Sequence, residues 1–253
     1  MLFQIFSIYR ALHKRVFRKN TKGLFKLFLK LANKFPLTIS VGKIKYLVRI
    51  IDVPIFIEIF QDKIYDFFQL KPGQTVIDVG AHVGFFTLKA SNAVGATGKV
   101  IALEPSSNNY AFLIRNIALN KSNNITPLKL GLFKKTGQAK LYTEHGLNTG
   151  GNSLYKPTFS YELIPVTNFE YLLRLTKSRR INLLKMDVEG AELEILKSAS
   201  KKDLKKIDCM VIEVHKDVVD VLELENLLRK NGFKCLVCKD CLYSFKHTIP
   251  ATV

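Results

Sequence analysis

The sequence predicts an α/β fold built on a doubly wound, mostly parallel sheet. From residue 71 onward, short apolar runs rich in β-branched side chains alternate with segments of helical periodicity, which is typical of such sheets. One of these runs leads directly into a glycine turn and then into a helix pattern. The 253 residues, 47% of them hydrophobic, supply enough apolar material for a buried core and exclude a disordered chain.

Residues 1–35 are expected to form two basic amphipathic helices, separated near residues 20–23. Apolar side chains recur there at steps of three and four. Residues 1–50 hold twelve of the 39 Lys and Arg residues and no Asp or Glu. Most of the net charge of +18 therefore lies within residues 1–50. Such helices are typical of proteins that bind an anionic membrane surface. Packing against the domain with a solvated basic face, and binding of nucleic acid, are the alternatives.

A hairpin is expected next, within residues 37–50, because the sequence alternates around Val41-Gly42-Lys43. Residues 55–70 then follow helical periodicity. We therefore divide the chain in two. Residues 1–70 contain the basic helices, the hairpin and a further helix, and residues 71–253 form the main domain.

The main domain is expected to contain five strands of the parallel sheet, at residues 75–79, 99–103, 125–130, 182–187 and 208–214. The long interval after the third strand indicates an inserted hairpin, with strands at 138–142 and 163–166 and a loop rich in Gly, Asn and Ser at 146–153. A last hairpin, at 234–245, turns at Lys239-Asp240. It carries Cys235, Cys238 and Cys241, which we interpret as ordinary hairpin residues, with a zinc or iron–sulfur site as the alternative.

The strongest local signal is the glycine turn after the first strand, Asp78-Val79-Gly80-Ala81-His82-Val83-Gly84-Phe85. Glycines let the backbone approach a cofactor, and the following helix offers free N–H groups. Glu104 ends the second strand, where an acid can accept hydrogen bonds from two ribose hydroxyls. The glycine spacing differs from the dinucleotide fingerprint, so the pair favours an adenosyl cofactor without a pyrophosphate. A purely structural turn is the alternative.

The turn and Glu104 together resemble the cofactor site of class I S-adenosylmethionine-dependent methyltransferases. The later run Lys185-Met186-Asp187-Val188-Glu189-Gly190-Ala191-Glu192 resembles the hallmark of the FkbM-type members, supported by Asn116, Asn120, residues 150–154 and Ile212-Glu213-Val214-His215. The resemblance implies a Rossmann-like fold and S-adenosyl-L-methionine as cofactor. The implied cofactor-binding residues are Asp78, Gly80, Ala81, His82, Gly84, Phe85, Glu104 and Asp187. His82 stands where the family usually has Asn, and Glu170 where it usually has Asp.

Asp187, Glu213 and His215 are the predicted catalytic residues. They follow the fourth and fifth strands, and ligands of such sheets bind at the carboxyl ends of the strands. Methyl transfer to a hydroxyl needs an aligned oxygen and a group that takes its proton. Asp187 is the first candidate, with Glu213 and His215 as alternative bases.

The acids near the ends of these two strands also have possible roles outside catalysis. Glu189 and Glu192 suit the first turn of the next helix, where its dipole stabilises negative charge. Asp187 could instead organise its loop. Carboxylates with a histidine can also hold a hard cation, but no spacing requires one, so we predict no metal.

The resemblance implies an O-methyltransferase that acts on a small molecule or glycan, and we expect a hydroxyl of a sugar, glycan or glycolipid-like acceptor near a membrane. An RNA methyltransferase that grips phosphates through its basic N-terminal region is the alternative, and a noncatalytic binding protein is a third. The Asp187-Val188-Glu189-Gly190 run differs from the signature of base-nitrogen methyltransferases. Without a spanning apolar run or a signal-peptide pattern, we expect a cytoplasmic protein, with peripheral membrane attachment as an option.

Overall fold

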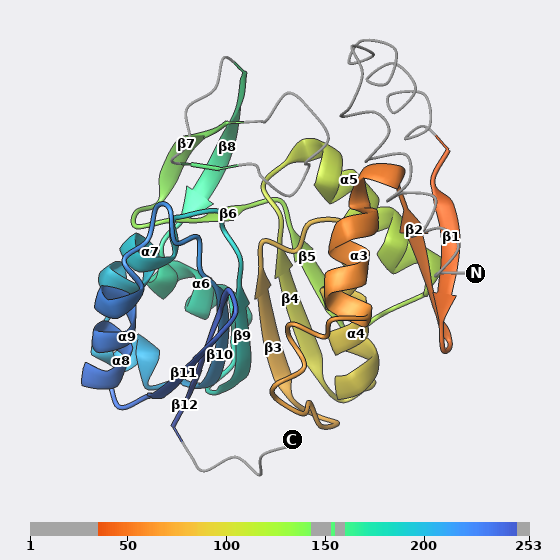
Figure 1. Cartoon of the computed structure of the whole chain (residues 1–253). Coiled ribbons are helices and arrows are strands. Elements are labelled where there is room, and N and C mark those ends of the chain that lie inside the picture. Colours follow the sequence, from red (N-terminus) through yellow and green to blue (C-terminus); the bar gives the residue numbers. More distant parts are fainter. Residues whose placement is uncertain (1–34, 143–152, 155–159, 247–253) are drawn as a thin grey trace.

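The structure is a computed structural model, and it describes residues 35–142, 153–154 and 160–246 (Figure 1). The two basic helices predicted within residues 1–35 and most of the loop at 146–153 lie outside the described residues. Among the residues that are described, no helix has the length and apolar character to cross a membrane.

A seven-stranded sheet forms the centre of the molecule, in the order β11-β12-β10-β9-β3-β4-β5. Neighbours from β10 to β5 pair in parallel, and β12 is antiparallel to both of its neighbours. The predicted doubly wound, mostly parallel sheet is therefore confirmed. The strands are β3 (Thr75–Val79), β4 (Lys99–Leu103), β5 (Ile125–Leu128), β9 (Ile181–Met186), β10 (Ile207–Glu213), β11 (Lys234–Cys238) and β12 (Cys241–Phe245).

Helices cover both faces of this sheet (Figure 1). One face carries α3 (Val53–Phe60), preceded by the short helix η1 (Ile50–Asp52), together with α4 (Phe85–Val94) and α5 (Ser107–Leu119). The other carries α6 (Phe169–Thr176), α7 (Glu192–Ser198), α8 (Lys201–Leu204) and α9 (Val221–Lys230). Side chains alternate along the strands, so Val76 enters one core and Ile77 the other. Burial on both faces explains why these strands are almost continuously apolar.

The N-terminal hairpin is confirmed as β1 (Leu37–Val41) and β2 (Ile44–Val48), which pair antiparallel around Gly42-Lys43. Asn116 of α5 holds it in place, because its side-chain oxygen accepts a hydrogen bond from the N–H of Leu47 at 2.7 Å. Buried residues of β2 and α3 belong to the same core as those of α4. The division of the chain at residue 70 stays a prediction.

The helix predicted over residues 55–70 is wrong in its second half, since α3 ends at Phe60. Lys63 has a φ of 54°, which a continuing right-handed helix does not allow. The apolar side chains that mimic helical spacing pack instead on the last strand. Phe67 stacks on Tyr243 with 4.5 Å between ring centroids, and this packing keeps residues 61–70 as turns against the sheet.

A second, three-stranded sheet follows the order β6-β8-β7, with β6 (Gly131–Leu132), β7 (Gly137–Tyr142) and β8 (Tyr161–Thr167). The antiparallel pair of β7 and β8 confirms the predicted inserted hairpin. This small sheet lies beyond the carboxyl ends of the main strands (Figure 1). It forms a wall next to the site described below.

The terminal hairpin is confirmed as β11 and β12 and carries three of the cysteines. Cys235 contacts Ser244 with 3.4 Å between sulfur and oxygen, and burial raises the pKa of Cys241 to about 12. Within the part of the chain that the structure describes, no cysteine belongs to a group with metal-ligand geometry.

Candidate active site

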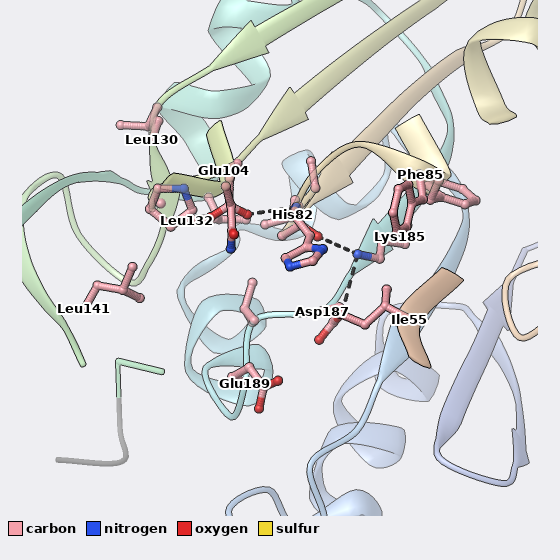
Figure 2. A pocket seen from close by; sticks show the side chains of 18 of the residues that line it. Ile55, His82, Phe85, Glu104, Leu130, Leu132, Leu141, Lys185, Asp187 and Glu189 are labelled. Atoms are coloured by element: carbon pink, nitrogen blue, oxygen red, sulfur yellow. Dashed lines mark hydrogen bonds and ion pairs between the residues drawn. The ribbon is translucent and has the colours of Figure 1, made fainter. Parts of the chain in front are cut away.

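A pocket of about 840 Å³, partly open to solvent, lies at the carboxyl ends of β3, β4 and β9 (Figure 2). Its floor is the glycine turn, and its walls come from α3, the small sheet and the loop after β9. The residues that line it are Ile55, Ile59, Tyr65, Val79, Gly80, Ala81, His82, Phe85, Phe86, Glu104, Pro105, Asn109, Leu130, Gly131, Leu132, Leu141, Leu154, Ile164, Lys185, Asp187, Val188 and Glu189.

The glycine turn is compact because no side chain fits at two positions. Gly80 has a φ of 77°, and a Cβ there would lie 1.8 Å from the carbonyl oxygen of Asp187. Gly84 has a φ of 91°, and a Cβ there would lie 2.6 Å from a methyl carbon of Leu113. The close approach of strand ends and α5 therefore depends on these glycines.

His82 adopts a left-handed backbone conformation, with a φ of 53°. Asn, Asp and His adopt this conformation more readily than other residues that carry a Cβ, so a His can stand here in place of an Asn. Burial lowers the pKa of His82 to about 4, although Asp52 lies 3.5 Å from its Nε2. The His82 side chain is therefore neutral at physiological pH.

Glu104 lies next to the glycine turn, at the end of β4, and is 5% exposed. One of its oxygens accepts a hydrogen bond from the N–H of His82 at 2.8 Å, and the other accepts one from Ser106 at 2.9 Å. Burial raises the pKa of Glu104 to about 7, and the two backbone N–H groups oppose that rise. The carboxylate is thus fixed in direction, and burial brings its pKa near neutral pH.

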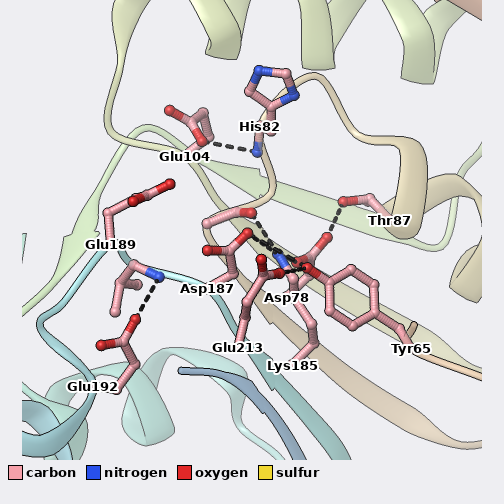
Figure 3. Close-up of polar contacts among 12 residues, drawn as sticks. Tyr65, Asp78, His82, Thr87, Glu104, Lys185, Asp187, Glu189, Glu192 and Glu213 are labelled. Carbon is pink, nitrogen blue, oxygen red and sulfur yellow. Dashed lines mark hydrogen bonds and ion pairs between the residues drawn. The ribbon is translucent and has the colours of Figure 1, made fainter. Parts of the chain in front are cut away.

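Asp78 lies behind the turn and is fully buried. It accepts a hydrogen bond from the hydroxyl of Thr87 at 2.5 Å, and its other oxygen lies 3.4 Å from the ammonium of Lys185. Lys185 also donates to the carbonyl of Gly80 at 2.7 Å (Figure 3). Asp78 and Lys185 therefore tie the turn to β9, while Gly80 and its neighbours face the pocket.

Asp187 directly follows β9, Glu213 is the last residue of β10, and both meet the hydroxyl of Tyr65 (Figure 3). Tyr65 donates to Glu213 at 2.5 Å and lies 3.5 Å from Asp187. Burial, followed by the charge of Asp187, raises the pKa of Glu213 to about 7. Lys185, 3.7 Å from Asp187, supplies positive charge at this point.

His215 lies beside this pair and contacts two further acids. Its Nδ1 is 3.0 Å from Glu192, and its Nε2 is 3.1 Å from Glu189 and 4.0 Å from Asp187. Burial lowers the pKa of His215, but the hydrogen bonds to both glutamates outweigh burial and raise it to about 11. In this arrangement His215 carries a proton at neutral pH.

The structure brings the residues predicted from the sequence to one edge of the sheet. Gly80, Ala81, His82, Phe85, Glu104 and Asp187 line the pocket. Asp78 and Gly84 lie behind its lining, and Glu213 and His215 adjoin Asp187. Glu192 begins α7, as expected for an acid in the first turn, whereas Glu189 precedes the helix. The individual roles of these residues stay predictions.

The sequence alone did not single out Tyr65, and it gave no role to Lys185, which stands in the quoted run at residues 185–192. Tyr65 falls in a segment that the periodicity assigned to a helix, so nothing in the sequence directed it to strands far along the chain. Lys185 stands between buried apolar residues of β9 and is 3% exposed. A lysine at a buried strand position requires a buried partner, and that signal could have identified it.

The pocket fits an adenosyl cofactor by the chemistry of its lining. Glu104 offers an oriented acceptor at the end of β4, the turn at Gly80 exposes backbone, and apolar side chains flank both. In open α/β sheets, a ribose is bound where an acid and a glycine turn lie at neighbouring strand ends. Asp187 and Glu189 add negative charge, which suits a sulfonium cation.

Comparisons with known proteins agree with a pocket that binds an adenosyl cofactor. A model of the methyltransferase FkbM domain matches residues 78–235. Methyltransferase 1 of Beauveria bassiana (strain ARSEF 2860) is 26% identical over 200 residues, with 71% of this chain and 80% of the relative covered. The 31-O-demethyl-FK506 methyltransferase FkbM of Streptomyces tacrolimicus is 29% identical over 240 residues, with 81% and 88% covered.

A solved structure of methyltransferase FkbM from Methylobacillus flagellatus KT has 16% identity and a TM-score of 0.49, covering 87% of this chain and 58% of that one. The FkbM domain match alone spans more than half of the chain. This chain therefore belongs to the FkbM methyltransferase family and is an S-adenosylmethionine-dependent methyltransferase.

Proposed function

We propose that this enzyme methylates a hydroxyl oxygen of a sugar, glycan or glycolipid-like acceptor. The observation that carries the proposal is that Glu104 and Asp187 line one pocket. The same pocket thus holds one acid that can bind a ribose, Glu104, and one that can accept a proton from a hydroxyl, Asp187. Transfer to oxygen is also supported by the printed name of the Streptomyces tacrolimicus relative, a 31-O-demethyl-FK506 methyltransferase.

Glu104 and the turn at Gly80 and Ala81 would hold the cofactor. Glu104 would accept hydrogen bonds from the ribose hydroxyls, and the backbone of the turn would contact the rest of the cofactor. His82, Phe85 and Asp187 line the same space. When bound, S-adenosylmethionine supplies an electrophilic methyl group, whose bond to sulfur breaks as the new bond to oxygen forms.

Asp187 would orient the acceptor hydroxyl and take its proton. It lies at the pocket, whereas Glu213 is already bonded to Tyr65 and His215 carries a proton in this arrangement. Both facts favour Asp187 over the two alternative bases. Tyr65 and Lys185, each in contact with Asp187, would keep its carboxylate directed at the pocket.

The lining also supports this class of acceptor. Apolar side chains of α3 and the small sheet line the same pocket as the carboxylates of Asp187 and Glu189 (Figure 2). Carboxylates accept hydrogen bonds from several hydroxyls at once, and apolar walls suit a sugar ring face or an attached lipid. Residues 1–35 would place the enzyme at an anionic membrane surface where lipid-linked acceptors lie.

The test is to replace Asp187 and follow methyl transfer to glycans and lipids. Cell extracts would be incubated with the enzyme and isotopically labelled S-adenosylmethionine, and labelled products identified by mass spectrometry. At saturating S-adenosylmethionine we expect Asp187→Asn to lower the rate by about 10²–10⁴-fold, the usual contribution of a general base, and calorimetry would measure separately how much cofactor affinity Asp187 provides. Glu194→Gln, on the exposed face of α7, is the matched control and should behave as the unmodified enzyme.

Two results would overturn the proposal. One is label found only on nitrogen or in RNA, which would favour the alternative substrate class. The other is an Asp187→Asn enzyme that transfers methyl groups at the full rate, which would remove Asp187 from the proton transfer.

A further inference from the structure

We propose that Asp187, Glu213 and His215, here called the strand-end cluster, bind a divalent metal ion. Each residue offers one ligand atom, and these atoms lie within 4.8 Å of one another. Metal–ligand bonds of about 2.0–2.6 Å place opposite ligands about 4–5 Å apart. The three side chains can therefore close on one ion with little movement. Among the residues that the structure describes, this is the one group with such geometry.

The environment of His215 points independently to a metal ligand. Its Nδ1 faces Glu192, which is fully buried, at 3.0 Å. The same oxygen of Glu192 accepts hydrogen bonds from the N–H groups of Val188 and Gly190 at 3.3 and 3.2 Å, so its position is fixed. A histidine that binds a metal usually donates its other N–H to such a carboxylate. Nε2 lies on the other side of the ring, 4.0 Å from Asp187 of the cluster and 3.1 Å from Glu189.

The charge around the imidazole also favours a cation. Three carboxylates lie within 4.0 Å of His215, those of Asp187, Glu189 and Glu192. The ammonium of Lys185 contacts Asp187, but it also lies 3.4 Å from the carboxylate of Asp78, which is outside the cluster. The ammonium of Lys185 thus faces a larger number of carboxylates. A divalent ion bound here would offset part of this negative charge.

The mixture of ligands narrows the choice of metal. One imidazole nitrogen with two carboxylate oxygens suits first-row divalent ions such as Mn²⁺, whereas a site with oxygen alone would favour Mg²⁺ or Ca²⁺. The absence of a thiolate ligand argues against a site specialised for soft metals.

The use of the metal rests on the proposed function. An ion next to Asp187 would bind the acceptor hydroxyl, hold it in line with the methyl group and lower the pKa of that hydroxyl. Only one oxygen of Asp187 is needed as a ligand, so the second stays available for the proton. Binding of the ion itself requires neither the cofactor nor the acceptor.

The experiment uses the full chain, stripped of metals with a chelator and titrated with Mn²⁺. Free Mn²⁺ is followed by electron paramagnetic resonance, and folding of each variant by circular dichroism. We expect one Mn²⁺ per chain, with affinity lowered at least about tenfold in Asp187→Asn and in Glu213→Gln. Glu192→Gln should weaken binding by about 10–100-fold through His215, as supporting residues of metal sites do. Nitrogen hyperfine coupling to bound Mn²⁺ should disappear in His215→Gln.

Glu194→Gln removes a nearby exposed carboxylate outside the cluster and should bind Mn²⁺ as the unmodified chain does. The proposal is overturned if Mn²⁺ does not saturate the protein below about 1 mM, the weak end of protein cation sites. It is also overturned if both carboxylate variants bind as Glu194→Gln does. A protein that binds S-adenosylmethionine but no Mn²⁺ would refute the metal alone. A protein that binds Mn²⁺ but methylates no hydroxyl would refute the proposed function alone.

Discussion

Glu104 combines a fixed orientation with a titration near neutral pH. Its pKa is raised to about 7 by burial, and ribose hydroxyls would bind its ionised form. Affinity for S-adenosylmethionine should therefore rise with pH as Glu104 loses its proton. If only the ionised form binds, the dissociation constant falls about tenfold between pH 6 and pH 8. Calorimetric titrations across this range would measure the effect.

Glu104→Gln separates this titration from others in the pocket. Burial raises the pKa of Glu213 to about 7 as well, so a pH effect alone does not identify the group. His82 titrates near pH 4, below the range. The Gln variant should bind the cofactor more weakly and with little dependence on pH. A tenfold change that persists in Glu104→Gln would assign the titration to another residue.

At the level of single residues, the sequence predicted the site residues that local backbone geometry positions. It did not predict those that contacts between distant segments bring to the site. Gly80, Gly84 and Glu104 follow strand ends at fixed spacings, so local geometry alone directs them to one edge of the sheet. Tyr65 reaches Glu213 only because residues 61–70 turn back over the sheet. Asn116 was recognised as a family match, but its contact with Leu47 across the fold was visible only in the structure.

At the level of elements, the strands were predicted more accurately than the second half of the N-terminal helix. Strands buried on both faces are short apolar runs whatever their neighbours are, and β3 and β4 agree to the residue. Residues 61–70 have helical spacing, but Phe67 finds its partner in β12. Periodicity records which residues are buried and leaves open what they are buried against.

The hairpin of β1 and β2 depends on Asn116. This side chain, fully buried, accepts a hydrogen bond from Leu47 at 2.7 Å and donates one to the carbonyl of Val83 at 2.8 Å. Asn116→Ala leaves both backbone groups without that partner, and each loss costs about 1–3 kcal/mol. We expect the free energy of unfolding, measured by urea denaturation, to fall by about 2–6 kcal/mol. Cofactor binding should weaken as well, because Val83 lies in the glycine turn.

Asn120 provides the matched control for that prediction. It makes the same type of paired contact with the backbone of Lys45, at 2.9 and 2.7 Å, but at an exposed position. Water replaces the lost partner there, so Asn120→Ala should cost less than about 1.5 kcal/mol. Equal losses for the two variants would show that burial of Asn116 is not the source of its importance.

Over the whole molecule, positive charge and active-site acids are separated along the chain. The residues after position 50 carry 27 Lys and Arg against 21 Asp and Glu, so the large net charge lies before them. The carboxylates that face the pocket come from the strand ends of the main domain. We infer that the N-terminal charge determines where the enzyme works, while the strand-end acids determine its chemistry.

Neutralising two N-terminal lysines tests this inference. Each Lys near an anionic membrane contributes about 1 kcal/mol of binding, so Lys26→Gln with Lys30→Gln should weaken binding to phosphatidylserine vesicles about thirtyfold. Lys201→Gln with Lys202→Gln removes the same charge from an exposed site on α8 and should leave vesicle binding unchanged. Co-sedimentation at several salt concentrations would measure both. Equal loss in the two pairs would assign vesicle binding to net charge alone. Unchanged vesicle binding in the N-terminal pair, with loss of RNA binding, would favour a nucleic-acid partner.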